Sequence, residues 1–222
     1  MGMDVLTGGI PLLNEALRAN RWPLAGLRML ELGNQQFRSS ALGAKVPAKQ
    51  VFETFGVEHT SIDINGLNGA LPLDLSKPIR DPKLMGAFDV VTNFGTTEHV
   101  SDQLECWHNI HHFVRPGGLV ISAVPHPDFP AGHCEYYYEE KFFEALSEHA
   151  GYAIEVMTRT PGHLIATTLR RGDSEFEAAQ IRESLPIYRP GTGSRKGVAR
   201  VLHRWRKKFI GLPTVPPDAP PA

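Results

Sequence analysis

The fold is decided by residues 152–169, which read YAIEVMTRTPGHLIATTL. The two halves of this stretch, 152–158 and 163–169, are rich in β-branched residues and predict two strands. Only a few residues around Thr160-Pro161-Gly162 separate them, whereas a crossover between parallel strands needs a dozen residues or more. We therefore expect an antiparallel hairpin at the end of the folded region.

Upstream of this hairpin, apolar strand-like runs alternate with stretches of helical periodicity. Helices are predicted at about 12–17, 41–55, 97–113 and 139–149, and strands at 27–32, 57–64, 71–75, 88–93 and 119–124. Strands that alternate with helices are typical of a parallel sheet covered on both faces. We expect an α/β fold with a doubly wound, mostly parallel, seven-stranded sheet and an antiparallel final strand.

The composition is that of one folded domain followed by a tail. The chain has 222 residues, of which 41% are hydrophobic and 21% charged, as in ordinary globular proteins. Two cysteines, Cys106 and Cys134, do not make a disulfide scaffold, and no apolar run is long enough to span a bilayer. We expect a cytoplasmic protein with a domain over residues 1–186, its core at about 25–170, and a separate segment over 187–222.

The tail differs from the domain in charge. Residues 1–194 carry 16 basic and 23 acidic residues, whereas 195–222 carry seven basic residues and one acidic residue. An acidic domain does not favour nucleic-acid binding. Apolar residues from Val198 to Phe209 follow helical spacing and predict a basic amphipathic helix over about 195–210. That helix can pack on the domain or on a second copy in a homo-oligomer, and peripheral contact with an anionic membrane is the alternative.

Four segments lie just beyond the carboxyl ends of predicted strands, where open α/β sheets bind ligands. They are residues 31–35, 63–65, 93–99 and 125–127. Gly33 permits a tight turn after the first strand, and Asp63 after the second is placed to accept hydrogen bonds from a ribose diol. Taken alone, each is better explained as an ordinary turn residue.

Taken together, these segments resemble the class I S-adenosylmethionine-dependent methyltransferases. The resemblance covers about residues 25–170 and rests on motifs in a characteristic order: Met29-Leu30-Glu31-Leu32-Gly33, Asp63, Leu73-Asp74-Leu75, Phe88-Asp89-Val90-Val91, Glu98-His99-Val100 and Val114-Arg115-Pro116-Gly117-Gly118-Leu119. It implies a Rossmann-like methyltransferase fold, S-adenosylmethionine as cofactor and methyl transfer to a small molecule. We expect oxygen as the acceptor atom.

The resemblance also implies which residues meet the cofactor. These are Glu31, Gly33, Asn34 and Gln35 at the methionine part, Asp63 at the ribose, Asp74 and Leu75 at the adenine, and Asn93 and Gly95 near the sulfonium. The family usually has two further glycines in its first loop, where this chain has Gln35 and Phe37. The Gln35 side chain can either block the cofactor or turn its amide toward it. A catalytically silent binding or scaffold protein of the same fold is therefore the second hypothesis.

An oxygen nucleophile needs a proton acceptor, and histidine suits this role near neutral pH. The candidate catalytic residues, in order of preference, are His126, His133 and His99. Each is equally well explained by a structural role. Glu98, His99 and His126 together offer oxygen and nitrogen ligands for a divalent metal, although we favour a site without metal.

Three further features of the sequence bear on the function. A nicotinamide oxidoreductase is disfavoured because its Gly-x-Gly-x-x-Gly turn is absent. The aromatic run Tyr136-Tyr137-Tyr138 can wall an acceptor or pack against the next helix. His108 and His112 share a helical face at a metal-binding spacing, but they lack an evident third ligand and are better explained as a solvated face.

Overall fold

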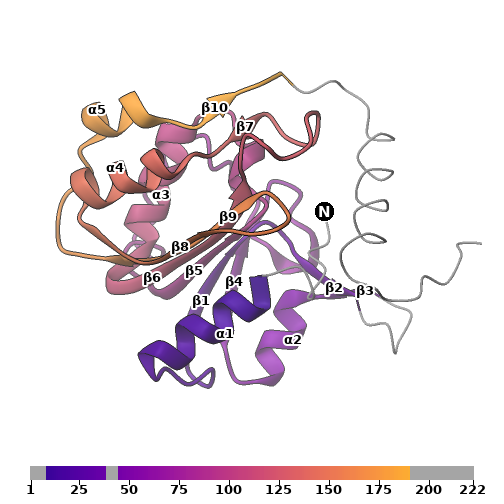
Figure 1. Cartoon of the computed structure of the whole chain (residues 1–222). Coiled ribbons are helices and arrows are strands. Elements are labelled where there is room, and N and C mark those ends of the chain that lie inside the picture. The colour runs from indigo at the N-terminus through magenta and orange to yellow at the C-terminus, as the bar shows by residue number, and fades with distance from the viewer. Residues whose placement is uncertain (1–8, 39–44, 191–222) are drawn as a thin grey trace, which may run out of the picture.

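The computed structural model describes residues 9–38 and 45–190 (Figure 1). The predicted helix over 195–210 and the rest of the basic tail lie outside the described residues. Among the helices that are described, none combines the length and apolar character needed to cross a membrane.

The central sheet has six strands and is mostly parallel. Its spatial order is β4 (Glu58–Ile62), β1 (Arg28–Leu32), β5 (Phe88–Phe94), β6 (Val114–Pro125), β9 (Leu164–Arg171) and β8 (Tyr152–Arg159). The first four strands run parallel, and β9 pairs antiparallel with both β6 and β8. The expected α/β fold with an antiparallel final strand is confirmed, and the hairpin follows from the short β8–β9 connection.

The sheet has six strands in the described part of the chain, so the expected number of seven is wrong. The segment predicted as a third strand, 71–75, makes only one parallel bridge, between Leu71 and Ile62. Pro72 has no N–H group to continue the ladder. The Asp74 side chain then accepts a hydrogen bond from Ser76 N at 2.9 Å and turns the chain away from the sheet.

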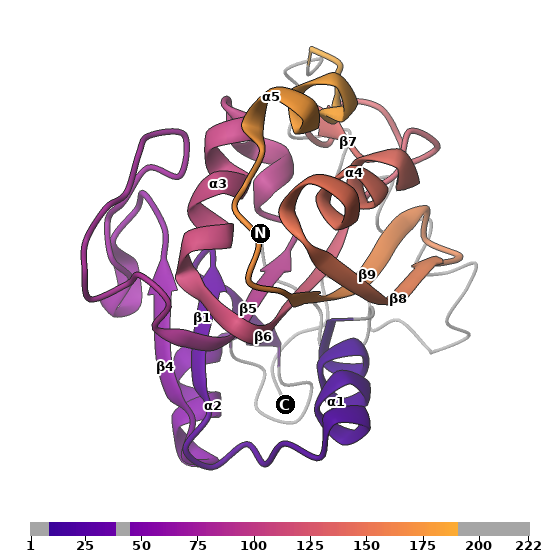
Figure 2. The same cartoon turned by 90° about the vertical axis from the view of Figure 1, so that its left-hand side faces the viewer.

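Helices cover both faces of the sheet (Figures 1 and 2). The helices α1 (Gly9–Asn20) and α2 (Ala48–Thr54) lie on one face, and α3 (Gln103–Phe113), α4 (Glu140–Ala150) and the short α5 (Ala178–Ile181) lie on the other. Consecutive side chains of a strand point to opposite faces. Accordingly Met29 packs in the apolar cluster under α1 and α2, whereas Leu30 packs in the cluster that contains Trp107 of α3.

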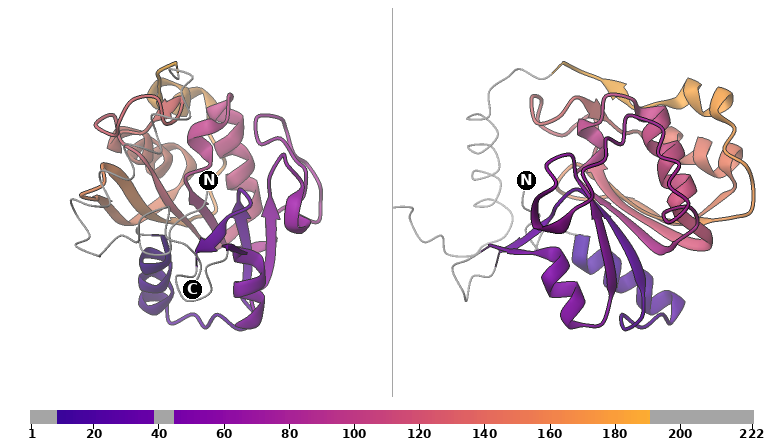
Figure 3. Two further views of the ribbon diagram at one scale, coloured as in Figure 1. Left: turned by 90° about the vertical axis from the view of Figure 1, so that its right-hand side faces the viewer. Right: turned by 180° about the vertical axis from the view of Figure 1, so that it is seen from behind.

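Two helices begin later than the sequence pattern predicts. The helix expected from residue 41 begins at Ala48, because Pro47 has extended backbone (φ −53°, ψ 134°) at the preceding position. Before it, β2 (Gln36–Arg38) and β3 (Lys45–Pro47) form a small antiparallel ribbon that projects from the sheet (Figure 3).

The helix expected from residue 97 begins at Gln103. Asp102 caps it, since its carboxylate accepts a hydrogen bond from Glu105 N at 3.0 Å. Residues Thr97–His99 form a separate 3₁₀ turn, η2. Glu98 and His99 therefore lie in the turn that follows β5 and not on a face of α3.

The chain stays in contact with the domain beyond residue 186. After α5 and the turn η3 (Arg182–Ser184), the two-residue strand β10 (Ile187–Tyr188) pairs antiparallel with β7 (Tyr136–Tyr137). Tyr137 and Tyr138 are fully buried, and Tyr138 packs against Trp107 and Phe142. The aromatic run could either line an acceptor or pack against the next helix, and packing accounts for Tyr137 and Tyr138.

A buried histidine of α3 makes stability depend on pH. His111 is 2% exposed and lies against the rings of Tyr152 and Phe176. Burial lowers the pKa of His111 to about 3, because the charged imidazolium loses its hydration. Between pH 6.5 and 3, the unfolded chain binds a proton at this residue that the folded chain does not.

We expect the free energy of unfolding to fall as the pH is lowered below 6.5, with His111 contributing about 1 kcal/mol per pH unit. The variant His111→Gln should lose this part of the slope, whatever its stability at neutral pH. Urea unfolding of both proteins from about pH 7.5 down to about pH 4.5 measures the two slopes, and equal slopes would refute the assignment.

Candidate functional site

The turn at Gly33 brings the ends of three strands together. Leu32, the last residue of β1, is in register with Ile62 of β4 and Asn93 of β5. Gly33 has φ +82°, donates its N–H to Ile62 O at 2.8 Å, and has no room for a side chain, since a Cβ would lie 2.6 Å from Thr96 Oγ1. The turn therefore requires glycine both for its conformation and for its surroundings.

Asp63 follows β4 and faces this turn. Its Oδ2 accepts a hydrogen bond from Asn34 N at 2.8 Å, and its Oδ1 accepts one from Asn65 N at 2.9 Å. The Asn34 side chain binds the same loop, since its Nδ2 donates to Leu67 O at 3.1 Å. Gly33, Asn34 and Asp63, which were predicted to share a site, are brought together.

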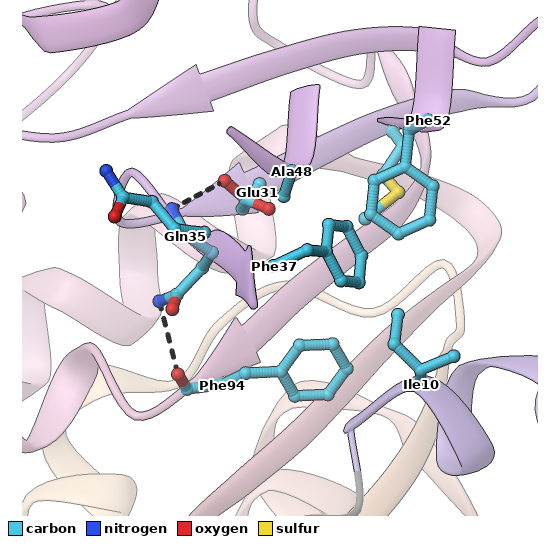
Figure 4. A pocket seen from close by; sticks show the side chains of 9 residues that line it. Ile10, Glu31, Gln35, Phe37, Ala48, Phe52 and Phe94 are labelled. Carbon is cyan, nitrogen blue, oxygen red and sulfur yellow. Dashed lines mark hydrogen bonds between the residues drawn. The ribbon is translucent and has the colours of Figure 1, made fainter. Parts of the chain in front are cut away.

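Gln35 is packed into the first loop (Figure 4). Its backbone N–H donates to Glu31 Oε1 at 3.0 Å, and its side-chain Nε2 donates to Phe94 O at 3.2 Å and lies 3.3 Å from Thr96 Oγ1. The Gln35 Oε1 atom is buried and has no hydrogen-bond partner among the described residues. The amide thus joins the ends of β1 and β5 and leaves one acceptor unused.

Behind Gln35 lies a small, mostly apolar hollow. Phe37 and Phe52 meet there edge to face, with ring centroids 5.7 Å apart, and Glu31, Ala48 and Phe94 are among the other residues that line it (Figure 4). Its cavity volume is about 10 Å³, close to the room that one water molecule needs. The two side chains that replace the family's glycines therefore fill this part of the loop.

The remaining predicted cofactor residues lie in two places. Asp74 and Leu75 lie in the segment beside β4: Asp74 is exposed, and hydrogen bonds from Ser76 lower its pKa. Leu75 is buried. Asn93 at the end of β5 is fully buried and holds the η2 turn, because its Nδ2 donates to Thr97 Oγ1 at 2.9 Å and its Oδ1 accepts from Thr97 N at 3.2 Å.

Gly95 follows β5 and leads into the turn that carries Glu98. It has φ +76°, and a Cβ there would lie 3.2 Å from Glu98 Oε1. Glu98 is buried, and burial raises its pKa to about 8. Its neighbour His99 is half exposed at the side chain and places Nε2 3.9 Å from Glu98 Oε1.

The predicted histidines separate into two groups. His99 and His133 are side by side, with ring centroids 5.7 Å apart, and burial lowers the pKa of His133 to about 4. His126 is buried elsewhere in the same loop, with Nδ1 3.2 Å from Asp128 N and 3.1 Å from Asp128 Oδ2. Among the described residues, the group with metal-ligating spacing contains Glu98, His99 and His133, not the predicted set with His126.

Two residues of the site were not predicted. The hydroxyl of Thr96 donates to Leu32 O at 2.8 Å and closes the turn from the β5 side. His59 of β4 is buried with Nε2 3.6 Å from Glu31 Oε2. His59 could have been noticed in the sequence as a histidine at an inward position of an apolar strand. The role of Thr96 is revealed only by the folded turn.

Solved structures of methyltransferases share this fold. The 1,6-didemethyltoxoflavin-N1-methyltransferase of Burkholderia thailandensis, solved with bound S-adenosylhomocysteine, is similar over 76% of this chain and 80% of its own, with 17% identity and a TM-score of 0.54. A putative sarcosine dimethylglycine methyltransferase from Galdieria sulphuraria is similar over 77% of this chain and 86% of its own, with 12% identity and a TM-score of 0.52.

An S-adenosylmethionine-dependent methyltransferase from Mesorhizobium loti is similar over 71% of this chain and 96% of its own, with 16% identity and a TM-score of 0.50. No protein-family model and no curated protein matches the sequence. The structural likeness establishes the fold: the chain has the Rossmann-like fold of the class I methyltransferases.

Two substitutions separate the energetic cost of steric crowding at Gly33 from the cost of its positive φ. We expect Gly33→Ala to lower the free energy of unfolding by more than about 2 kcal/mol, because it adds a steric clash to the cost of a positive φ. Gly26 has a similar φ of +78°, but no atom lies within 4 Å of the position that a Cβ would take there. Gly26→Ala should therefore cost only about 1 kcal/mol. Urea unfolding measures both, and equal losses would contradict the crowding.

Proposed function

We propose that the chain is an S-adenosylmethionine-dependent methyltransferase that acts on a small molecule, most readily at oxygen. The observation that carries this proposal is the placement of Asp63 against the glycine turn at Gly33. Two backbone N–H groups hold its carboxylate at the carboxyl end of β4, where a carboxylate can also accept hydrogen bonds from two ribose hydroxyls.

The first loop offers groups that suit the cationic part of the cofactor. The cofactor carries a sulfonium and an ammonium group, and the Glu31 carboxylate lies below the loop with Oε1 bound to Gln35 N. The buried, unpartnered Gln35 Oε1 is an acceptor for an incoming ammonium group. The proposed cofactor site comprises Glu31, Gly33, Asn34, Gln35, Asp63, Asp74, Leu75, Asn93 and Gly95.

When bound, S-adenosylmethionine supplies a methyl group on a positively charged sulfur. The protein must align the acceptor oxygen with that methyl group and accept the proton that the oxygen loses. We assign this role to His126, which lies in the loop after β6 with its ring beside the Asp128 carboxylate. His133, kept neutral by burial, and His99 are the alternatives.

One observation favours a second candidate function, a catalytically silent binding protein of the same fold. The Gln35 side chain is packed between the ends of β1 and β5, and Phe37 packs on Phe52 behind it. In this alternative, the two side chains occupy space that a cofactor needs. The acceptor atom is also open to test, since the Burkholderia relative is an N1-methyltransferase.

Calorimetry with S-adenosylmethionine and S-adenosylhomocysteine tests the proposal. We expect the wild type to bind both, and Asp63→Asn to bind them about 10- to 100-fold more weakly, the usual cost of about 1–3 kcal/mol for hydrogen bonds to a charged group. Asp81→Asn is the matched control, because Asp81 is exposed and forms a similar turn through Lys83 N. If the wild type does not bind at millimolar cofactor, the catalytically silent protein is favoured. If Asp63→Asn binds the cofactor as tightly as the wild type, another residue holds the ribose.

Replacing Gln35 separates the two candidate functions directly. If the amide faces the cofactor, Gln35→Gly should bind S-adenosylhomocysteine several-fold more weakly than the wild type, because an acceptor is lost. If the side chain blocks the site, the same variant should gain affinity. The dissociation constants of the two proteins, measured after confirming equal far-ultraviolet circular dichroism, give the sign of the effect.

A further inference from the structure

Glu98, His99 and His133 form a cluster of potential metal ligands at the carboxyl end of β5. Glu98 and His99 come from the η2 turn, and His133 comes from the loop between β6 and β7. Each offers one ligand atom, and these three atoms all lie within 4.8 Å of one another. The contact is tertiary, since the loop is bound to the turn through Glu135 N, which donates to Glu98 O at 3.2 Å.

Two polar atoms of the cluster are buried without a partner. Glu98 is 1% exposed, and neither its Oε2 atom nor His133 Nδ1 has a hydrogen-bond partner among the described residues. Leaving such groups unsatisfied has a free-energy cost. A cation that both atoms could coordinate would remove this cost, whereas purely structural residues are normally paired.

The turn that carries Glu98 and His99 is firmly held. Asn93 binds both the N–H and the hydroxyl of Thr97, and Tyr138 donates its hydroxyl proton to Thr97 Oγ1 at 2.7 Å. On the other side, the ring of Phe129 packs against His133 with centroids 5.0 Å apart. The surrounding hydrogen bonds and ring contacts therefore hold the potential ligands in position, as metal sites require.

We propose that Glu98, His99 and His133 bind a divalent transition-metal ion of the Zn²⁺ type. One carboxylate and two imidazoles are a ligand set that Zn²⁺ accepts, with a fourth position left for water or another small ligand. Tetrahedral bonds of about 2.1 Å place ligand atoms about 3.4 Å apart, so ligand atoms that lie within 4.8 Å of one another must approach by up to about 1.4 Å. The His99 side chain is 42% exposed, which gives the ion an entry path and the ligand room to move.

Two other groups near histidines do not make a competing site. His108 and His112 approach each other with Nε2 atoms 3.0 Å apart, but the guanidinium of Arg80 lies 3.4 Å from His108 Nδ1 and disfavours a second cation. Cys134, next to His133, donates its thiol proton to Tyr136 O. Cys134 is also outside the group of residues whose ligand atoms lie within 4.8 Å of one another.

The proposal concerns metal binding alone and goes beyond the proposed methyl transfer, so either can fail without the other. Titration of the chelator-treated full chain with ZnCl₂ in a calorimeter should show one tight site per chain. Glu98→Gln and His133→Gln should weaken Zn²⁺ binding by about 100-fold or more, since the loss of even an outer-shell partner of a metal costs about 10- to 100-fold. Glutamine keeps the shape of Glu98 but cannot supply a carboxylate ligand.

The matched controls are His112→Gln in the α3 pair and His126→Gln in the same loop as His133, and both should bind Zn²⁺ like the wild type. A second readout is the thermal midpoint, which Zn²⁺ should raise for the wild type and the controls but not for the ligand variants. If the two buried variants do not fold, His99→Gln at the half-exposed ligand gives the same test. The proposal is overturned if no Zn²⁺ binds, if the ligand variants bind it unchanged, or if binding is lost in His112→Gln.

Discussion

The carboxyl end of β1 is fastened to both of its neighbours by two short hydrogen bonds. Gly33 N donates to Ile62 O on the β4 side, and Leu32 O accepts from Thr96 Oγ1 on the β5 side, both at 2.8 Å. These bonds align the three loops that follow the strands, so Asp63 and the turn after β5 take their positions relative to Gly33. Because a Cβ at Gly33 would collide with Thr96, this alignment leaves no freedom for another residue there.

The two buried carboxylates near this end of the sheet, those of Glu31 and Glu98, differ in how the protein binds their oxygen atoms. Glu31 accepts a hydrogen bond at Oε1 from Gln35 N at 3.0 Å, and its Oε2 lies 3.6 Å from His59 Nε2. Glu98 has an oxygen without any partner among the described residues, and burial raises its pKa to about 8. The first carboxylate stabilises the loop as it stands, whereas burial of the second favours its protonated form.

The sequence predicted the periodic elements but missed side chains that bind the backbone and contacts between distant segments. The β8–β9 hairpin was predictable because the connection around Pro161 is too short for a crossover. The failure of 71–75 to form a strand and the late start of α3 depend on side chains that bind the backbone, at Asp74 and at Asp102. The partner of Glu98 and His99 is His133 and not His126, because loop packing, which no periodicity reports, decides which histidine reaches the turn.

The β7–β10 pair has a consequence for the order in which the molecule is completed during synthesis. Ile187 and Tyr188 pair with Tyr137 and Tyr136, and Arg189 adds hydrogen bonds to Glu135 O and Pro127 O, both at 2.8 Å. The loop that carries His126 and His133 is thus closed by residues that leave the ribosome well after the sheet strands. A nascent chain can pair its sheet strands first, and the histidine loop gains these contacts only when residues 187–189 have been translated.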